Sequence, residues 1–370
     1  CVICAIASLA TGSSWTVAGT LGVALIGVSG GLGIAPEMAA GAVISGAYFG
    51  DKMSPLSDTT NLAPAVARTD LFDHIRHMSW TTVPSFTIAL VLFAIIGFRS
   101  NVATDQQTFA ALLQTLEQSF NISVWTLVPL VVVMVMAFRK VPPLPTILFG
   151  ALLGGVLAAL LQPDSVRQFV AAAPGTASIE VMLRGIWLAL ADGYVATTGV
   201  AEVDDLLSRG GMSSMLTTIW LIITALAFGA VLEHAGLLHR LIEAAIRRAR
   251  STGSLITTVV LSCIGMNVIA ADQYIAIVLP GKMFRVEFAR RGLDPRNLSR
   301  AIEDSGTMTS ALVPWNTCGA YMAATLGVAT LAYLPFAFFN LISPLMSIAY
   351  GVTGFSIRHI EPAETALESA

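Results

Sequence analysis

Five long apolar stretches constrain the fold of this chain most strongly. They run at roughly 80–98, 122–138, 142–162, 214–234 and 331–354. A helix needs about 20 mostly apolar residues to cross the hydrocarbon core of a bilayer. Across the chain 55% of the residues are hydrophobic and 12% are charged, whereas soluble domains carry about 25% charged residues. The sequence therefore predicts an all-α polytopic membrane protein surrounded by lipid.

Three further regions, 1–34, 36–66 and 252–329, are apolar but interrupted by polar residues. We interpret the whole chain, 1–370, as a single membrane transporter domain. Its predicted parts are a first repeat region with polar breaks (1–98), connecting helices with an amphipathic helix at 236–250 (99–251), a second repeat region (252–354) and a polar tail (355–370). Because the chain starts at Cys1 inside an apolar stretch, we expect a fragment that lacks the N-terminal helices.

Composition also limits the partners of the chain. The formal net charge of -3 gives no indication of a nucleic-acid partner. The four cysteines lie in apolar surroundings without metal-ligand spacing, so we expect buried thiols. Nothing in the sequence indicates a cofactor.

Lysine and arginine are dense in the loops at 67–79, 139–141 and 236–251, and sparse at 99–121 and 163–212. By the positive-inside rule the first three loops are cytoplasmic and the other two are external.

A basic stretch at 282–300 follows a single apolar run at 252–281. If that run crosses the membrane once, the basic stretch is external and violates the positive-inside rule. If the run contains a broken or re-entrant turn, the stretch is cytoplasmic. We favour the re-entrant turn.

The most polar interruption lies at 45–64, where Pro55 removes a backbone donor and restricts Ser54. Its oxygen donors are Asp51, Ser54, Ser57, Asp58, Thr59, Thr60 and Asn61. Oxygen ligands suit hard cations such as Na⁺, and ionisable groups in a membrane segment commonly mark an ion path. The alternatives are an exposed loop in which Asp58 caps a helix starting near Thr59, and pairing of Asp51 with Lys52.

Two other interruptions are similar in kind. The first, around Ser13 and Ser14, could unwind a helix and free its carbonyls, or could simply serve close helix packing. The second runs from Asn267 to Thr317 and contains Asp272, Gln273, Glu303, Asp304, Ser310 and Asn316. For Asp272 the alternative is a loop position, and for Glu303 and Asp304 it is the start of a helix.

The 45–64 interruption and the later one resemble each other. Gly50–Leu56 aligns with the segment Gly306–Leu312, and an earlier polar break precedes each segment at a similar distance. Corresponding broken segments in two halves of a chain indicate a transporter site. The sequence leaves open whether the repeats are parallel or inverted.

The longer motifs of the chain are SGAYFGDKMSPLSDTTNLAPAVA (45–67), DLFDHIRHM (70–78), LLSRGGMSSML (206–216), QYIAIVLPGKMF (273–284) and LSRAIEDSGTMTSALVPWNTCGAYMAATLGV (298–328). Together they resemble the NhaC family of sodium/proton antiporters. The resemblance implies an inverted-repeat secondary transporter with broken helices and re-entrant hairpins. It also implies a multi-pass protein of the prokaryotic cytoplasmic membrane that couples Na⁺ to H⁺, in a family with some exchangers of malate for lactate or of amino acids.

We therefore expect Na⁺ and H⁺ to compete for buried carboxylates. The candidate carboxylates are Asp58 and Asp304, then Asp51, Glu303 and Asp272. The candidate neutral ligands are Ser13, Ser14, Ser54, Thr59, Thr60, Asn61, Gln273, Ser310, Asn316 and Thr317. We predict that Na⁺ binds at Asp58, Asn61, Asp304 and Asn316. These residues belong to two clusters, one around Asp58 and one around Asp304, which we expect to meet near the membrane centre.

Other functions receive less support from the sequence. An organic acid or an amino acid is an alternative substrate. A buried arginine would favour such an anionic substrate, but most arginines lie in loops. An intramembrane enzyme is disfavoured, because the apolar segments contain no HExxH and no serine–histidine pairing. A purely structural subunit would not explain the acids and amides within apolar segments. A second copy of the chain is a further candidate partner.

Overall fold

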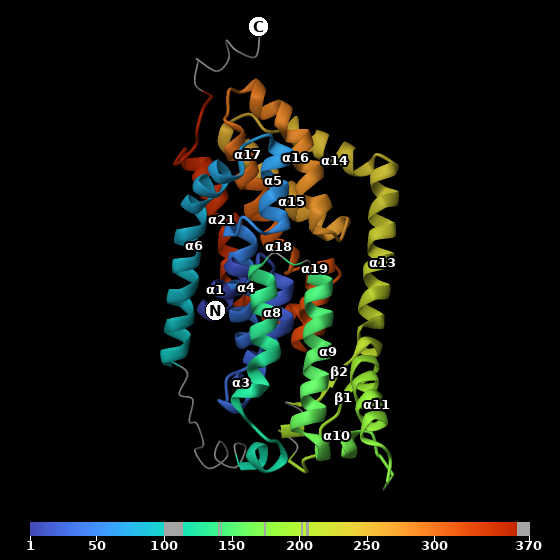
Figure 1. The fold of residues 1–370 in the computed structure, drawn as a ribbon. Coiled ribbons are helices and arrows are strands. Elements are labelled where there is room, and N and C mark those ends of the chain that lie inside the picture. The colour runs from blue at the N-terminus through green and yellow to red at the C-terminus, as the bar shows by residue number, and fades with distance from the viewer. Residues whose placement is uncertain are drawn as a thin grey trace. The chain divides into compact units, whose positions relative to one another are not determined.

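The computed structural model describes residues 1–99, 114–139, 141, 143–173, 175–200, 203–204 and 207–360. These residues are almost entirely helical and divide into two compact units (Figure 1). The first unit comprises the described residues of Cys1–Gly22, Glu37–Ser100 and Trp220–Ala370, and the second those of Val23–Pro36 and Asn101–Ile219. The predicted tail lies outside the described residues beyond Ile360, as does most of the 99–121 loop.

The first unit contains all the polar interruptions and is built from broken helices. Its elements are α1 (Val2–Thr11), α2 (Ser14–Val17), the π-helical turn η1 (Ala18–Gly22), α4 (Pro36–Met53), α5 (Asp58–Ala67), α6 (Leu71–Arg99), α14 (Leu237–Ile246), α15 (Thr252–Ile269), α16 (Gln273–Arg290), α17 (Pro295–Ile302), the π-helical turn η3 (Glu303–Thr307), α18 (Met308–Ser310), α19 (Thr317–Leu326), α20 (Thr330–Tyr333), the 3-10 turn η4 (Leu334–Phe336) and α21 (Phe338–Thr353).

The second unit consists mainly of apolar helices. Its elements are α3 (Val23–Gly31), the 3-10 turn η2 (Val124–Leu127), α8 (Val128–Phe138), α9 (Pro143–Leu161), α10 (Pro163–Phe169), α11 (Ser178–Ala191), β1 (Gly193–Tyr194) and β2 (Arg209–Gly210). The two short strands pair antiparallel, with Gly193 opposite Gly210. Helix α13 (Met212–His234) begins in this unit and continues into the first.

Most of the predicted membrane helices are present. Helices α8, α9 and α13 match three predicted stretches, and α6 matches a fourth but begins earlier, at Leu71. Helix α13 is apolar on all sides and exposes Trp220, Ile223 and Val231, as expected for a lipid-facing helix. The predicted helix at 331–354 is wrong in its first part, because the chain there forms α20 and η4 and α21 begins only at Phe338.

In the described part of the chain, four helices are long and apolar enough to cross a membrane, or up to six if each of two bent pairs counts as one span. One bent pair joins α9 to α10 at 108°, and the other joins α19 to α20 and η4 at 90°.

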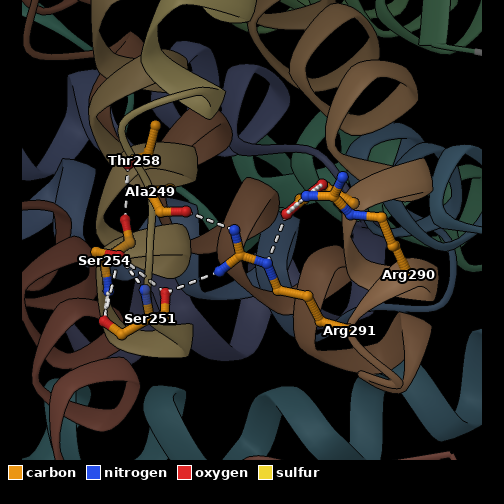
Figure 2. A network of polar contacts seen from close by, with 7 residues as sticks. Ala249, Ser251, Ser254, Thr258, Arg290 and Arg291 are labelled. Atoms are coloured by element: carbon orange, nitrogen blue, oxygen red, sulfur yellow. Dashed lines mark hydrogen bonds and ion pairs between the residues drawn. The ribbon is translucent and has the colours of Figure 1, made fainter.

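Helices α15 and α16 form a re-entrant hairpin. Asn267, near the end of α15, and Ile277, near the start of α16, both lie against Gly306. The outer ends of the two helices also meet, because Arg291 donates hydrogen bonds to the carbonyls of Ala249 and Ser251, the latter at 3.1 Å (Figure 2). The run 252–281 therefore turns back instead of crossing once.

This hairpin explains the position of the basic stretch. Arg291 lies beside the 236–251 loop, and Arg296 lies 3.6 Å from Asp73 at the start of α6. Arg285 donates to the carbonyl of Val66 at the end of α5. The expectation that 282–300 shares a face with 67–79 and 236–251 is confirmed.

Helices α1 and α2, joined at Gly12, form a second hairpin that lies against α4. Cys1 is next to Gly46 and Ser8 is next to Gly50, so α1 and α4 run in the same direction. After the turn, Ser14 contacts Asp51 and Gly22 contacts Val43, so the second arm runs back along α4.

The two broken helices cross the unit in opposite directions. The helix α4–α5 is unwound at Ser54–Ser57, and the helix formed by α17, η3, α18 and α19 is unwound at 311–316. Tyr48 meets Ser310 and Lys52 meets Asp304, so residue numbers rise along one helix as they fall along the other. Because one hairpin lies along the first half of each helix, the two repeats are inverted.

Candidate functional site

The centre of the first unit contains an ion pair between the two repeats. The ammonium Nζ of Lys52, in the last turn of α4, pairs with Oδ1 of Asp304 in η3, and neither side chain is exposed. Lys52 also donates to Ser343 Oγ at 2.6 Å, and Thr81 Oγ1 donates to Asp304 Oδ1 at 3.1 Å. Helices α6 and α21 therefore hold the pair from two sides.

Glu303 places a second carboxylate beside the pair. Its Oε1 accepts a hydrogen bond from Thr307 Oγ1 at 2.9 Å, across the π-helical turn η3. Its Oε2 and Oδ2 of Asp304 are buried and have no hydrogen-bond partner. A wider helical turn at this position is typical of functional sites. Both carboxylates thus present one uncommitted oxygen inside the protein.

Asp51 supplies the third carboxylate and fastens the first hairpin to α4. Its Oδ1 accepts from the backbone N–H of Ser14 at 3.0 Å and from Ser57 Oγ at 3.5 Å. Ser14 is the first residue of α2, where free N–H groups and the helix dipole favour a negative charge. The backbone carbonyl of Asp51 accepts from the hydroxyls of Thr59 and Thr60, which close the unwound segment after Pro55.

The second repeat has a neutral counterpart of this junction. Gln273, the first residue of α16, accepts hydrogen bonds through Oε1 from Ser310 Oγ at 2.9 Å and Cys318 Sγ at 3.0 Å. Tyr48 from the first repeat lies 3.4 Å from Ser310 Oγ. The aligned serines Ser54 and Ser310 both lie where a helix unwinds.

A pair of amides fixes the second break. Asn316 Nδ2 donates to Asn267 Oδ1 at 3.0 Å, and Asn267 Nδ2 donates to the carbonyl of Gly306 at 2.7 Å. Oδ1 of Asn316 accepts from the backbone N–H of Cys318 and from Thr317 Oγ1. The polar groups of Asn316 are thus engaged in holding the unwound chain.

The structure brings only some of the sequence candidates together. Asp304 and Glu303 lie near Lys52, and Asp51 interacts electrostatically with Glu303, whereas Asp58 is exposed in the first turn of α5. Asn61 is also exposed, and it donates to the carbonyls of Pro55 and Ser57. Among the described residues we find no contact that joins these two to Asp304.

The other candidates have local structural roles. Asp272 caps α16 by accepting from the N–H of Ile275 at 3.0 Å, and Ser13 caps α2 by accepting from Thr16. Ser54 is fully buried and accepts from the N–H of Leu56.

Two alternatives raised by the sequence are wrong. Lys52 pairs with Asp304 and not with its neighbour Asp51. Glu303 and Asp304 do not begin a helix, because they follow α17 directly and are fully buried.

Sequence reasoning missed the partners of the ion pair, Thr81 and Ser343. One signal for Thr81 was available, because His74, His77, Thr81 and Ser85 recur three or four residues apart and form one polar face of α6. No comparable pattern marks Ser343, whose role depends on how α21 packs.

Comparisons with known proteins agree with this architecture. A model of the Na⁺/H⁺ antiporter family matches residues 46–355. The chain is 43% identical over 358 residues to the Na⁺/H⁺ antiporter NhaC of Alkalihalophilus pseudofirmus, covering 96% of this chain and 73% of that protein.

Two relatives have other named substrates. The malate-2H⁺/Na⁺-lactate antiporter of Bacillus subtilis is 36% identical over 356 residues, covering 95% of this chain and 72% of the relative. The arginine/ornithine antiporter ArcD of Halobacterium salinarum is 36% identical over 368 residues, covering 99% and 72%. Since the family model and the relatives both extend over the broken helices and the buried ion pair, this multi-pass membrane protein belongs to the Na⁺/H⁺ antiporter family.

Proposed function

We propose that this chain exchanges Na⁺ for H⁺ across the membrane, and that the two ions compete for the buried carboxylates of Asp304, Glu303 and Asp51. The observation that carries the proposal is the charge balance at the centre of the first unit. Three buried carboxylates, those of Asp304, Glu303 and Asp51, face only two buried cations there, Lys52 and Arg300. Uncompensated charge is costly in a buried site, so a bound cation or a proton completes the balance.

The oxygen atoms available at this site suit Na⁺. Asp304 Oδ2, Glu303 Oε2 and Ser14 Oγ are buried and have no hydrogen-bond partner. Hard cations take oxygen ligands such as carboxylates and hydroxyls. A proton on one of the carboxylates removes the charge that attracts Na⁺, so occupation by one ion weakens binding of the other.

Inverted repeats that each contain a broken helix provide the exchange between two faces. In this arrangement one repeat or bundle rocks against the other around a fixed central site. The Lys52–Asp304 pair joins the two repeats, so its formation and loss would accompany that movement.

We place the protein in the cytoplasmic membrane of a prokaryote, because the named relatives come from bacteria and an archaeon. The face that holds 67–79, 236–251 and 282–300 would then be cytoplasmic by the positive-inside rule. Lipid as a partner and assembly with a second copy remain predictions.

The test uses everted membrane vesicles containing the protein, a dye that reports the pH gradient and additions of NaCl. Asp304→Asn and Glu303→Gln should abolish Na⁺-dependent proton movement, whereas Glu243→Gln, an exposed residue on α14, should not. Asp58→Asn should change the half-maximal Na⁺ concentration by about twofold at most, as expected for an exposed charge. Wild-type transport by Asp304→Asn and Glu303→Gln together would refute the carboxylate mechanism.

Exchange of an organic acid or an amino acid is the second candidate, since two relatives are named for such substrates. One buried cation favours it, because Arg300 on α17 is 1% exposed and not in a loop. Its guanidinium, however, already donates to Ser356 and lies over the Tyr350 ring. Ion-gradient-dependent uptake of labelled malate, lactate or arginine by the same vesicles distinguishes this candidate from Na⁺/H⁺ exchange.

A further inference from the structure

We propose that a column of buried polar side chains between α6, α17 and α21 is the aqueous access route to the Lys52–Asp304 pair, and that Arg300 and Ser356 form the latch that closes it here. The inference rests on the proposed function and assigns the path that ions and water take to its site. The column consists of His74, His77 and Thr81 on α6, Arg300 on α17, Asp304 on η3, and Ser343 and Ser347 on α21.

Two walls of the column face each other along their length. His74 Nδ1 lies 2.9 Å from Ser299 Oγ on α17, and Thr81 Oγ1 donates to Asp304 Oδ1 at 3.1 Å. Residue numbers rise in the same order along both helices between these contacts, so α6 and α17 run side by side in the same direction. His77 lies between these levels on the polar face of α6, as Arg300 does on α17. The walls thus connect the start of α6 with the ion pair.

Helix α21 supplies the third wall. Ser343 Oγ lies 3.4 Å from Asp304 Oδ1, and Ser347 is one helical turn further along. Beyond Ser347, the ring centroid of Tyr350 lies 5.8 Å from the guanidinium carbon of Arg300.

The column is distinguished by polar atoms that nothing in the protein satisfies. The buried side-chain atoms without a hydrogen-bond partner include Asp304 Oδ2, Arg300 Nε, Ser347 Oγ, His74 Nε2 and both ring nitrogens of His77. Buried polar groups are nearly always paired with protein or with ordered water. Their concentration on three facing helices therefore indicates a path that water enters.

Arg300 obstructs this path between the ion pair and the start of α6. It is 1% exposed, and its Nη1 donates to the carbonyl of Ser356 at 3.3 Å and to Ser356 Oγ at 3.2 Å. It is one turn from Asp304 on the same helical element. A fixed guanidinium in a narrow polar path is both a steric and an electrostatic barrier to cations.

The segment 354–360 anchors the latch. Ile360 N–H donates to the carbonyl of Gly292, and Asp294 N–H donates to that of Arg358. Ser356 has φ 57, a left-handed conformation that is uncommon for a non-glycine residue and is typical of switch regions.

Charges at the outer end of the column reinforce the barrier. Burial alone would raise the pKa of Asp294, but its hydrogen bonds from Arg296 and the charge of that residue hold the pKa below its usual value. The side chains that interact electrostatically with His77 there are three cations, Arg296, Arg300 and Arg358, and one acid, Asp294. The closed column therefore opposes the passage of Na⁺ more strongly than that of an anion or of water.

The test measures access to Ser347 in a background carrying Cys1→Ser, Cys4→Ser, Cys263→Ser and Cys318→Ser, after transport in that background has been verified. Ser347→Cys should react with a membrane-impermeant cationic probe, trimethylammonium-ethyl methanethiosulfonate, added from the face at which α6 begins. Arg300→Met should raise that rate about tenfold, and should raise the rate of the anionic sulfonatoethyl probe less, because a like charge no longer repels the cation. Ser356→Ala should raise both rates.

Thr87→Cys is the matched control. Thr87 lies on the exposed side of the apolar helix α6, where it faces lipid, so it should react with neither of the charged probes. If Arg300→Met fails to fold, Ser356→Ala and Arg300→Lys carry the test. The inference is wrong if Ser347→Cys is unreactive in every background, reacts only from the other face, or reacts at a rate that no latch variant changes. The proposed function has its own readout, because Asp304→Asn tests Na⁺-dependent proton movement whatever the labelling result.

Discussion

Lys52 and Asp304 form an ion pair that links the two repeats, and neither side chain is exposed to solvent. The pair lies between the last turn of α4, just before the unwound segment Ser54–Ser57, and the π-helical turn η3. Its hydrogen-bond partners, Thr81 and Ser343, come from α6 and α21. A single contact thus depends on four separate elements, and its energetics should be measurable.

Removing one partner of this pair should be far more damaging than removing both. Lys52→Met leaves the carboxylate of Asp304 buried without its cation, which should lower the free energy of unfolding by about 3 to 5 kcal/mol. The double variant Lys52→Met with Asp304→Leu has no buried charge at this position and should be destabilised less. Equilibrium unfolding in mixed detergent micelles gives the free energies of unfolding of Lys52→Met, of Asp304→Leu and of the double variant.

The exposed pair Arg247–Glu243 on α14 is the control for this cycle. Its side chains are 76% and 47% exposed, so the corresponding variants should leave the free energy of unfolding almost unchanged. Additive effects of the two substitutions at Lys52 and Asp304 would mean that the pair does not contribute as a unit.

Gly50 should tolerate no side chain, because α1 and α4 touch there. A Cβ atom at Gly50 would lie 2.1 Å from Ser8 Oγ and 2.2 Å from the Ser8 backbone carbon. Gly50→Ala should therefore displace the first hairpin from α4, at a cost of about 1 to 3 kcal/mol, and should reduce the maximal transport rate. Gly97→Ala on α6 meets nothing within 4 Å, so it should leave the melting temperature and transport unchanged or slightly improved.

The sequence predicted the broken parts of the fold better than their arrangement. Pro55 and the run of hydroxyl residues around it were sufficient to place the break after α4, since proline and unsatisfied backbone groups terminate helices locally. The re-entrant turn before Asp272 was inferred from the charge of 282–300. The direction of the repeats could not be inferred, because it depends on which halves pack together, as Tyr48 and Ser310 do.

The site was harder to predict than the fold for a related reason. Acids in apolar segments were easily recognised, but the sequence does not show which of them are buried. Asp304 is buried, whereas Asp58 is exposed in the first turn of α5, and this difference follows only from the packing of the helices. Lys52 follows Asp51 directly, so sequence proximity suggested the wrong partner. Side chains of adjacent residues on a helix point about 100° apart, which turns Lys52 toward the other repeat.

The amide of Asn267 should be essential for the geometry of the second break. It donates to the carbonyl of Gly306 and to Thr309 Oγ1, and it accepts from Asn316, all inside the protein. Asn267→Ala removes three buried hydrogen bonds, each contributing about 0.5 to 1.5 kcal/mol, so it should destabilise the protein. Thermal unfolding in detergent measures the loss, with Asn61→Ala, whose side chain is exposed, as the smaller matched change.

The re-entrant hairpin makes a definite prediction about sidedness. In a background without other accessible cysteines, Arg76→Cys, Arg248→Cys and Arg290→Cys should all react with an impermeant thiol reagent from the same face of the membrane. Arg99→Cys, at the far end of α6, should react only from the opposite face. Right-side-out and everted vesicles provide the two orientations.

The position of Arg290 decides between the two topologies. If α15 and α16 crossed as one span, Arg290→Cys would react from the same face as Arg99→Cys and from the face opposite to Arg248→Cys. The hydrogen bonds of Arg291 to Ala249 and Ser251 exclude that separation, because they hold the two ends of the hairpin together. Arg291→Ala should weaken this link, which hydrogen exchange at the amides of 252–256 would detect as reduced protection, while the labelled face of Arg290→Cys stays the same.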